Sequence, residues 1–233
     1  MGAIMVLIIV ALSRISMRII NGLEEGIELF DTEVEYIARP PRRNLAMLTI
    51  TFYTLLELLI PGNPVTGWVA LAAAAAMLNL LNDWHIGRPL FNRWVFSLYS
   101  IYWAMALGYL LAGLAILSGW PLLSPARHIL TIGAIGFSVF IVMVFASQVH
   151  SGRTPEYRTW VLLASLSLLI AVVCRIAMSL PAFASLYHVL LSLSAILWMT
   201  AFSLFIGFFW KTLIRPSADG RRGCLPDHTQ NHS

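Results

Sequence analysis

Apolar residues fall into seven long runs along the chain, and short polar stretches separate them. The runs are Ala3–Ile20, Leu45–Ile60, Val65–Leu81, Trp94–Leu117, Ile129–Val149, Thr159–Leu180 and Leu186–Trp210. Roughly 20 residues of helix cross the ~30 Å hydrocarbon core of a bilayer. None of the runs shows the alternating polarity of a membrane barrel strand. The pattern therefore predicts an all-α fold, a polytopic transmembrane helix bundle of about seven helices over residues 1–215.

The last residues, 216–233, are polar and interrupted by Gly and Pro, which predicts a disordered tail. At the other end, an apolar run begins at residue 3 without a basic segment before it. We therefore expect the chain to correspond to part of a longer helical arrangement.

The composition is typical of a membrane protein, so the lipid bilayer is its expected partner. Of 233 residues, 59% are hydrophobic and 11% are charged, too few charges for the surface of a soluble domain. If the helices alternate in direction, twelve of the fifteen Lys and Arg residues fall on one side, and Arg127 alone falls on the other. Basic loops stay in the cytoplasm. The asymmetry predicts a membrane protein with its N-terminus outside and its C-terminal tail in the cytoplasm. Because basic residues mainly set orientation in such a protein, the net charge of +4 does not indicate a nucleic acid partner, and none is expected.

Two charged residues lie at matching depth inside apolar runs. Glu57 and Arg175 both precede a proline near the outer end of a predicted helix. Charge in hydrocarbon is costly unless it is paired or hydrated, so the two are expected to form an ion pair, or Arg175 to bind an anionic group of a cofactor. The alternative is that each side chain reaches separately to the interface.

Histidines are found at both predicted membrane surfaces. His128 and His188 open two helices at the outer face, whereas His85 and His150 lie at the inner face. In one regular helix His128 and His150 would be about 33 Å apart along the axis and only about 40° apart around it. One metal ion could not take both, so two layers on one helix face are expected. Neutral imidazole commonly ligates copper and haem iron, although an interfacial histidine can also be only a polar end-group.

The segment "HILTIGAIGFSVFIVMVFASQVHSGR", residues His128–Arg153, resembles the signature of the NnrS family, which runs roughly "HALTxGAIG…MxxxSxGHTGR". The matching positions are His128, Thr131, Gly133, Ala134, Ile135, Gly136, Met143, Ser147, His150, Gly152 and Arg153. Further matches are "RPL" at 88–90, "LGYLLAGLA" at 107–115, Arg175, "LWMTAFSLF" at 197–205 and "DG" at 219–220. The resemblance covers nearly the whole chain, and its central block is the specific part.

The resemblance implies a protein of the bacterial inner membrane that contains haem b and copper and is linked to nitric oxide metabolism, denitrification or tolerance of nitrosative stress. It marks His128, His150, Arg153 and Arg175 as cofactor-binding residues, with His128 and His150 as metal ligands. His188 matches no family position, and it is a candidate metal ligand only because it lies at the predicted outer face. Covalent c-type haem is excluded because the two cysteines form no CxxCH motif.

The chain departs from the family in two ways that affect function. It resembles only the C-terminal part of longer members, so a homodimer or a companion membrane subunit would supply the missing helices. Tyr99 stands where many members carry a histidine. Two alternatives therefore stay open: a non-catalytic subunit or truncated remnant without a complete metal site, and a small-solute transporter. No nucleotide or flavin motif is present, so the sequence does not decide whether the protein is an enzyme.

Overall fold

The computed structural model describes residues 1–25, 40–82, 88–151, 153 and 155–214, and their regular structure is entirely helical. The predicted tail and His85 lie outside the described residues. The elements are α1 (Gly2–Glu25), α2 (Pro40–Leu59), α3 (Pro64–Leu81), η1 (Arg88–Phe91), α4 (Arg93–Ser118), α5 (Leu123–His128), η2 (Ile129–Gly136), α6 (Phe137–His150), α7 (Thr159–Met178), η3 (Pro181–Leu186) and α8 (Tyr187–Ile214). Since α5, η2 and α6 are continuous, seven long helical rods result, as predicted.

Five spans of the described chain are long and apolar enough to cross a membrane. They are Pro64–Leu81, Arg93–Ser118, Leu123–His150, Thr159–Met178 and Pro181–Ile214. Within α1, a shorter apolar stretch covers Gly2–Ser16. The protein is therefore a multi-pass helical membrane protein.

Polar residues in the turns set where the helices begin and end. The Asn63 side chain accepts a hydrogen bond from the Val65 amide at 2.9 Å, and Pro64 occupies the first turn of α3. Asn92 caps α4 in the same way through the Trp94 amide. Gly119 ends α4 with a φ of 72°, a left-handed conformation that glycine adopts without a Cβ clash.

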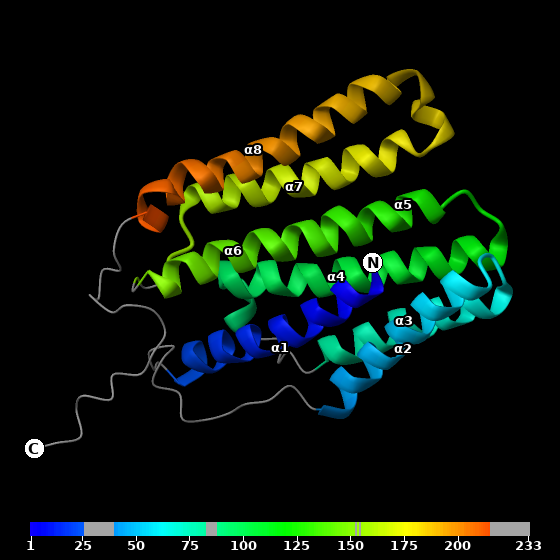
Figure 1. Ribbon diagram of the computed structural model, residues 1–233, viewed down its shortest axis with the longest axis horizontal. Coiled ribbons are helices and arrows are strands. Elements are labelled where there is room, and N and C mark those ends of the chain that lie inside the picture. Colours follow the sequence, from blue (N-terminus) through cyan, green and yellow to red (C-terminus); the bar gives the residue numbers. More distant parts are fainter. Residues whose placement is uncertain (26–39, 83–87, 152, 154, 215–233) are drawn as a thin grey trace, which may run out of the picture.

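The rods lie side by side as successive layers, with α8 at one edge, then α7, then the α5–η2–α6 rod, and α4 next to that rod (Figure 1). The α3 and α4 helices approach each other closely, since a Cβ on Gly113 would lie 2.9 Å from the Gly67 carbonyl oxygen. Within Pro181–Ile214, only 17% of the apolar 18-residue window is buried, against 39–50% of the corresponding windows in the other four spans. The α8 helix therefore presents most of its surface outward.

Candidate functional site

His128 ends α5 at the end of the bundle that the sequence predicts to face outward, where α5 packs against α7. This end is called the outer end below, and the opposite end the inner end. Its half-buried ring lies within electrostatic range of the Arg175 guanidinium on α7. A hydrogen bond of 3.1 Å between the hydroxyls of Ser124 and Ser179 joins the same two helices. The structure thus brings together two of the predicted cofactor-binding residues.

Arg175 is held by a serine rather than by a carboxylate. Its Nε donates to Ser194 Oγ at 3.2 Å, and the Ser194 hydroxyl donates to the Ala171 carbonyl at 3.1 Å. Ser194, on α8, is only 1% exposed. Its bond to Arg175 therefore places a cation in the contact between α7 and α8.

The expected ion pair between Glu57 and Arg175 is wrong. Glu57 Oε1 instead accepts a hydrogen bond from Arg127 Nη2 at 3.1 Å, which ties α2 to α5. Both side chains lie at the same end of the bundle, but Arg175 is directed at Ser194, on the opposite side of the bundle from α2.

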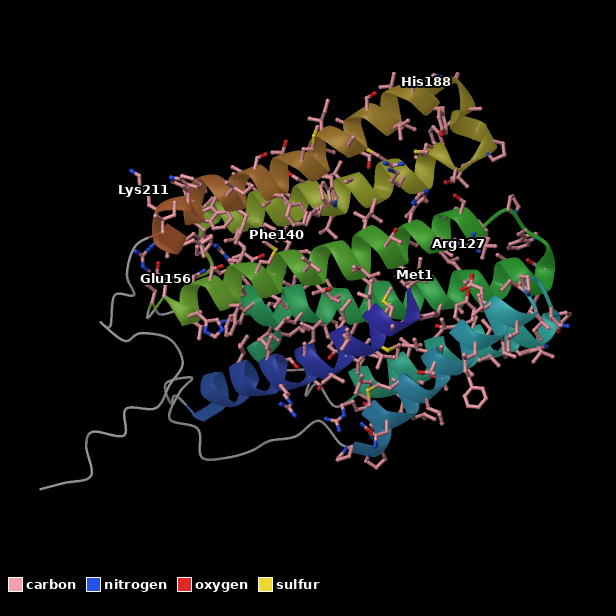
Figure 2. All side chains as sticks on the ribbon, in the orientation of Figure 1. Met1, Arg127, Phe140, Glu156, His188 and Lys211 are labelled. Atoms are coloured by element: carbon pink, nitrogen blue, oxygen red, sulfur yellow. The ribbon has the colours of Figure 1, made fainter. Side chains whose placement is uncertain are left out.

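His188 lies apart from His128. Figure 2 shows it at the start of α8, across α7 from Arg127, the chain neighbour of His128. Its side chain is exposed, and its ring lies edge-on to Tyr187 at 5.4 Å. Among the residues that the structure describes, no three His, Cys, Asp or Glu side chains are grouped so that they could hold a metal ion.

The inner end of the same rod carries the second part of the signature. Met143, Ser147 and His150 stand four and three residues apart on α6, which places them on one helix face. They line a groove of about 490 Å³, whose opposite wall includes Phe205 and Leu213 of α8. His150 is exposed at the mouth of this groove.

A π-helix separates the two ends and rotates one against the other. Ile129–Gly136 is π-helical, and a helix with i→i+5 hydrogen bonds turns less per residue than an α-helix. The expected shared face of His128 and His150 assumed a regular α-helix and is wrong. His128 borders α7, whereas His150 borders the groove beside α8.

Gln148 fixes the loop that follows α6, and it was not predicted from the sequence. Its buried side-chain amide accepts from the Glu156 amide at 2.6 Å and donates to the Glu156 carbonyl at 3.2 Å. The Gln148 main-chain carbonyl accepts from the Arg153 amide at 3.0 Å. An amide in the last turn of an otherwise apolar run was the available signal.

Tyr157 attaches the same loop to the bundle. Its hydroxyl lies 2.9 Å from Ser97 Oγ on α4 and 3.1 Å from Ser165 Oγ on α7. Trp94 packs edge-on against its ring at 4.9 Å. These contacts hold the end of the loop between α4 and α7.

Arg153 is exposed and lines a groove of its own, next to that of His150. This second groove, of about 470 Å³, is formed by Gln148, Arg153, Glu156, Arg158, Trp160, Phe208, Phe209 and Thr212. Thr212 alone lines both grooves. The structure therefore separates the Arg153 side chain from the groove that contains His150. Tyr99, at the family's histidine position, packs edge-on against Trp103 within α4 at 6.3 Å.

The helical rods and the polar residues at their two ends define a multi-pass membrane protein with signature residues at both surfaces. A family model, described as NnrS protein, matches residues 1–217, so the chain belongs to the NnrS family and the resemblance is confirmed. No curated protein and no solved structure matches the chain.

Proposed function

We propose that this protein binds haem and copper and acts in nitric oxide metabolism or in tolerance of nitrosative stress. Family membership over residues 1–217 carries the proposal. Supporting it, the structure gathers Met143, Ser147 and His150, which are signature positions, on one groove.

The inner groove fits a haem better than an isolated metal ion. His150 offers an imidazole, the usual axial ligand, beside the apolar walls of Phe205 and Leu213. Met143 lies two turns away, about 10 Å along the helix, which is too far for easy sharing of one ion. A haem bound here would supply an iron centre for one-electron and nitric oxide chemistry. His150 would hold the iron, and Met143 and Phe205 would contact the ring.

At the outer end, the chemistry of the side chains favours a haem over copper. His128 supplies one ligand, but the neighbouring Arg175 cation opposes a second positive charge there. An arginine fork instead suits a carboxylate such as a haem propionate. Ser194 would keep Arg175 in position for that role.

Copper requires ligands beyond those that the described residues bring together. His188 is exposed at the start of α8, where a second chain can reach it. We therefore place the copper site between His188 and a partner, either a second copy or a companion subunit.

Absorption spectra and metal analysis of the purified protein test this proposal. We expect a Soret band that weakens strongly in His150→Ala and changes differently in His128→Ala. His188→Ala is the matched histidine control, and it should lower copper while leaving the haem spectrum unchanged. A wild-type protein without a Soret band, purified from cells that make haem, would favour a subunit without a complete metal site or a transporter.

We propose further that the protein lies in the bacterial inner membrane with its C-terminus in the cytoplasm. Arg153, Arg158 and Lys211 gather at one end of the bundle, whereas Arg127 lies at the other (Figure 2). That asymmetry is the expected one for cytoplasmic loops. A reporter fused after Arg215 should be active only as a cytoplasmic fusion, and a periplasmic signal would reverse the assignment.

A further inference from the structure

The groove that contains Arg153 combines cationic and apolar walls. Arg153 and Arg158 contribute two positive charges, and Glu156 contributes one negative charge. Arg158 Nε donates to Glu156 Oε2 at 3.1 Å, which uses one of its five donors. The remaining donors of both arginines suit an oxyanion, and the groove keeps a net positive charge.

This groove is built on a fixed loop and an aromatic wall. The paired bonds of Gln148 to Glu156 and the contacts of Tyr157 hold the loop against the ends of α4, α6 and α7. The rings of Trp160 and Phe208 stack at 4.8 Å with an interplanar angle of 8°. A ligand that binds here therefore meets an ordered surface.

Phe208 connects this polar groove to an apolar one along α8. It also lines a groove of about 540 Å³ that is formed by Ile196, Met199, Thr200, Ser203, Leu204, Gly207 and Phe208. A Cβ on Gly207 would have no atom within 4 Å, so the glycine leaves a depression. From Ile196 to Phe208 the groove runs about 18 Å along the helix axis, which matches one leaflet of a ~30 Å hydrocarbon core.

We propose that this end of the protein binds an anionic phospholipid. Its phosphate lies between Arg153 and Arg158, and one acyl chain follows α8 across Phe208 and over Gly207. Lys211, one turn beyond Gly207 on α8, provides a further cation where the headgroup enters the groove. Basic pockets between membrane helices are the usual sites for such headgroups.

Charge and dimensions favour a lipid over a second copy of the chain. In a two-fold contact through this face, each copy would bring its own arginines toward those of the other. A phospholipid instead supplies one negative group and an apolar chain of leaflet length. Each of these parts meets its counterpart in one of the two grooves.

The test compares lipids on the purified protein in detergent. Thermal unfolding and native mass spectrometry follow the addition of phosphatidylglycerol, of phosphatidylcholine or of inorganic phosphate. We expect phosphatidylglycerol to stabilise the wild type more than phosphatidylcholine does. The double variant Arg153→Gln, Arg158→Gln should weaken that binding about tenfold or more, since charge-assisted hydrogen bonds are lost. Arg93→Gln, an exposed cation on α4, is the matched control and should change nothing.

A second pair of variants tests the acyl groove. Gly207→Leu places a side chain in the depression, where a Cβ meets no atom within 4 Å, and should displace the lipid. Ala195→Leu, also exposed on α8, should not. Equal binding of the two lipids, or full replacement of the effect by inorganic phosphate, would overturn the proposal. So would a dimer that Gly207→Leu dissociates, or a loss of haem in the arginine variant with lipid binding unchanged. None of these results depends on whether the protein handles nitric oxide.

Discussion

Polar residues have different surroundings at the two ends of the α5–η2–α6 rod. At the outer end, Arg175 is bonded to Ser194 inside the contact between α7 and α8, so the polar groups are part of helix packing. At the inner end, Gln148 binds the main chain of Glu156, and His150 and Arg153 face open grooves. One end is closed by neighbouring helices, and the other is accessible. The first is suited to hold a bound group rigidly, and the second to admit one.

The π-helical segment η2 accounts for this difference between the two ends. It lies between the two ends and packs closely against α4 and α7. A Cβ on Gly133 would lie 3.4 Å from the Ala104 Cβ and 3.6 Å from Val172. π-helical turns inside α-helices are frequent at functional sites. Here the turn directs His128 toward α7 while α6 presents His150 beside α8.

Gln148→Leu should detach the loop at the inner end and cause the largest decrease in the free energy of unfolding. Leucine has a similar size but leaves both main-chain groups of Glu156 without their side-chain partner, at a cost of about 2 kcal/mol or more. Unfolding in mixed micelles would measure the loss, and limited proteolysis would report release of the 151–158 loop. Ser167→Ala, which removes only a bond within α7, is the control. A loop that stays resistant to protease in Gln148→Leu would contradict this account.

The sequence was sufficient for the rods and their approximate ends. The predicted Val65–Leu81 and Trp94–Leu117 became Pro64–Leu81 and Arg93–Ser118, because a membrane helix must satisfy every main-chain group internally and so requires a long apolar run. That requirement does not depend on the partners of the helix, which is why it can be read from the sequence.

The features that the sequence did not reveal concern rotation about the helix axis. In "ILTIGAIG" nearly every position is apolar or small, so no periodicity distinguishes a π-helix from an α-helix. Hydropathy likewise gives the depth of Glu57 and Arg175, but not the direction in which each side chain points. The candidate site was therefore predicted as residues and layers, and its actual partners, Ser194 and Arg127, came from the packing.

Ser194→Ala, at the closed outer end, should lower the free energy of unfolding by a smaller amount. It removes the acceptor of Arg175 Nε and a donor to the Ala171 carbonyl, and we expect a loss of about 1–2 kcal/mol. Ser192→Ala, on the exposed side of the same helix, is the matched control. Combined with Arg175→Gln, the effects should be less than additive, because the two residues share one bond. Strict additivity would show that the bond contributes nothing to stability.

The smallest expected effect is a coupling energy, which tests whether Glu57 pairs with Arg127 or with Arg175. The bond between Glu57 and Arg127 joins side chains that are 32% and 53% exposed, so a double-mutant cycle with Glu57→Gln and Arg127→Gln should give a coupling of about 0.2–1 kcal/mol. The corresponding cycle with Arg175→Gln should give a coupling near zero, because Arg175 is bonded to Ser194 on the far side of the bundle. Both cycles are measured by unfolding in the same micelles and at two salt concentrations, since an exposed pair weakens as salt rises. If Glu57 coupled more strongly to Arg175 than to Arg127, the outer end would have to close around a buried ion pair. The contrast between a serine-held arginine within the bundle and an exposed pair at its edge would then be lost.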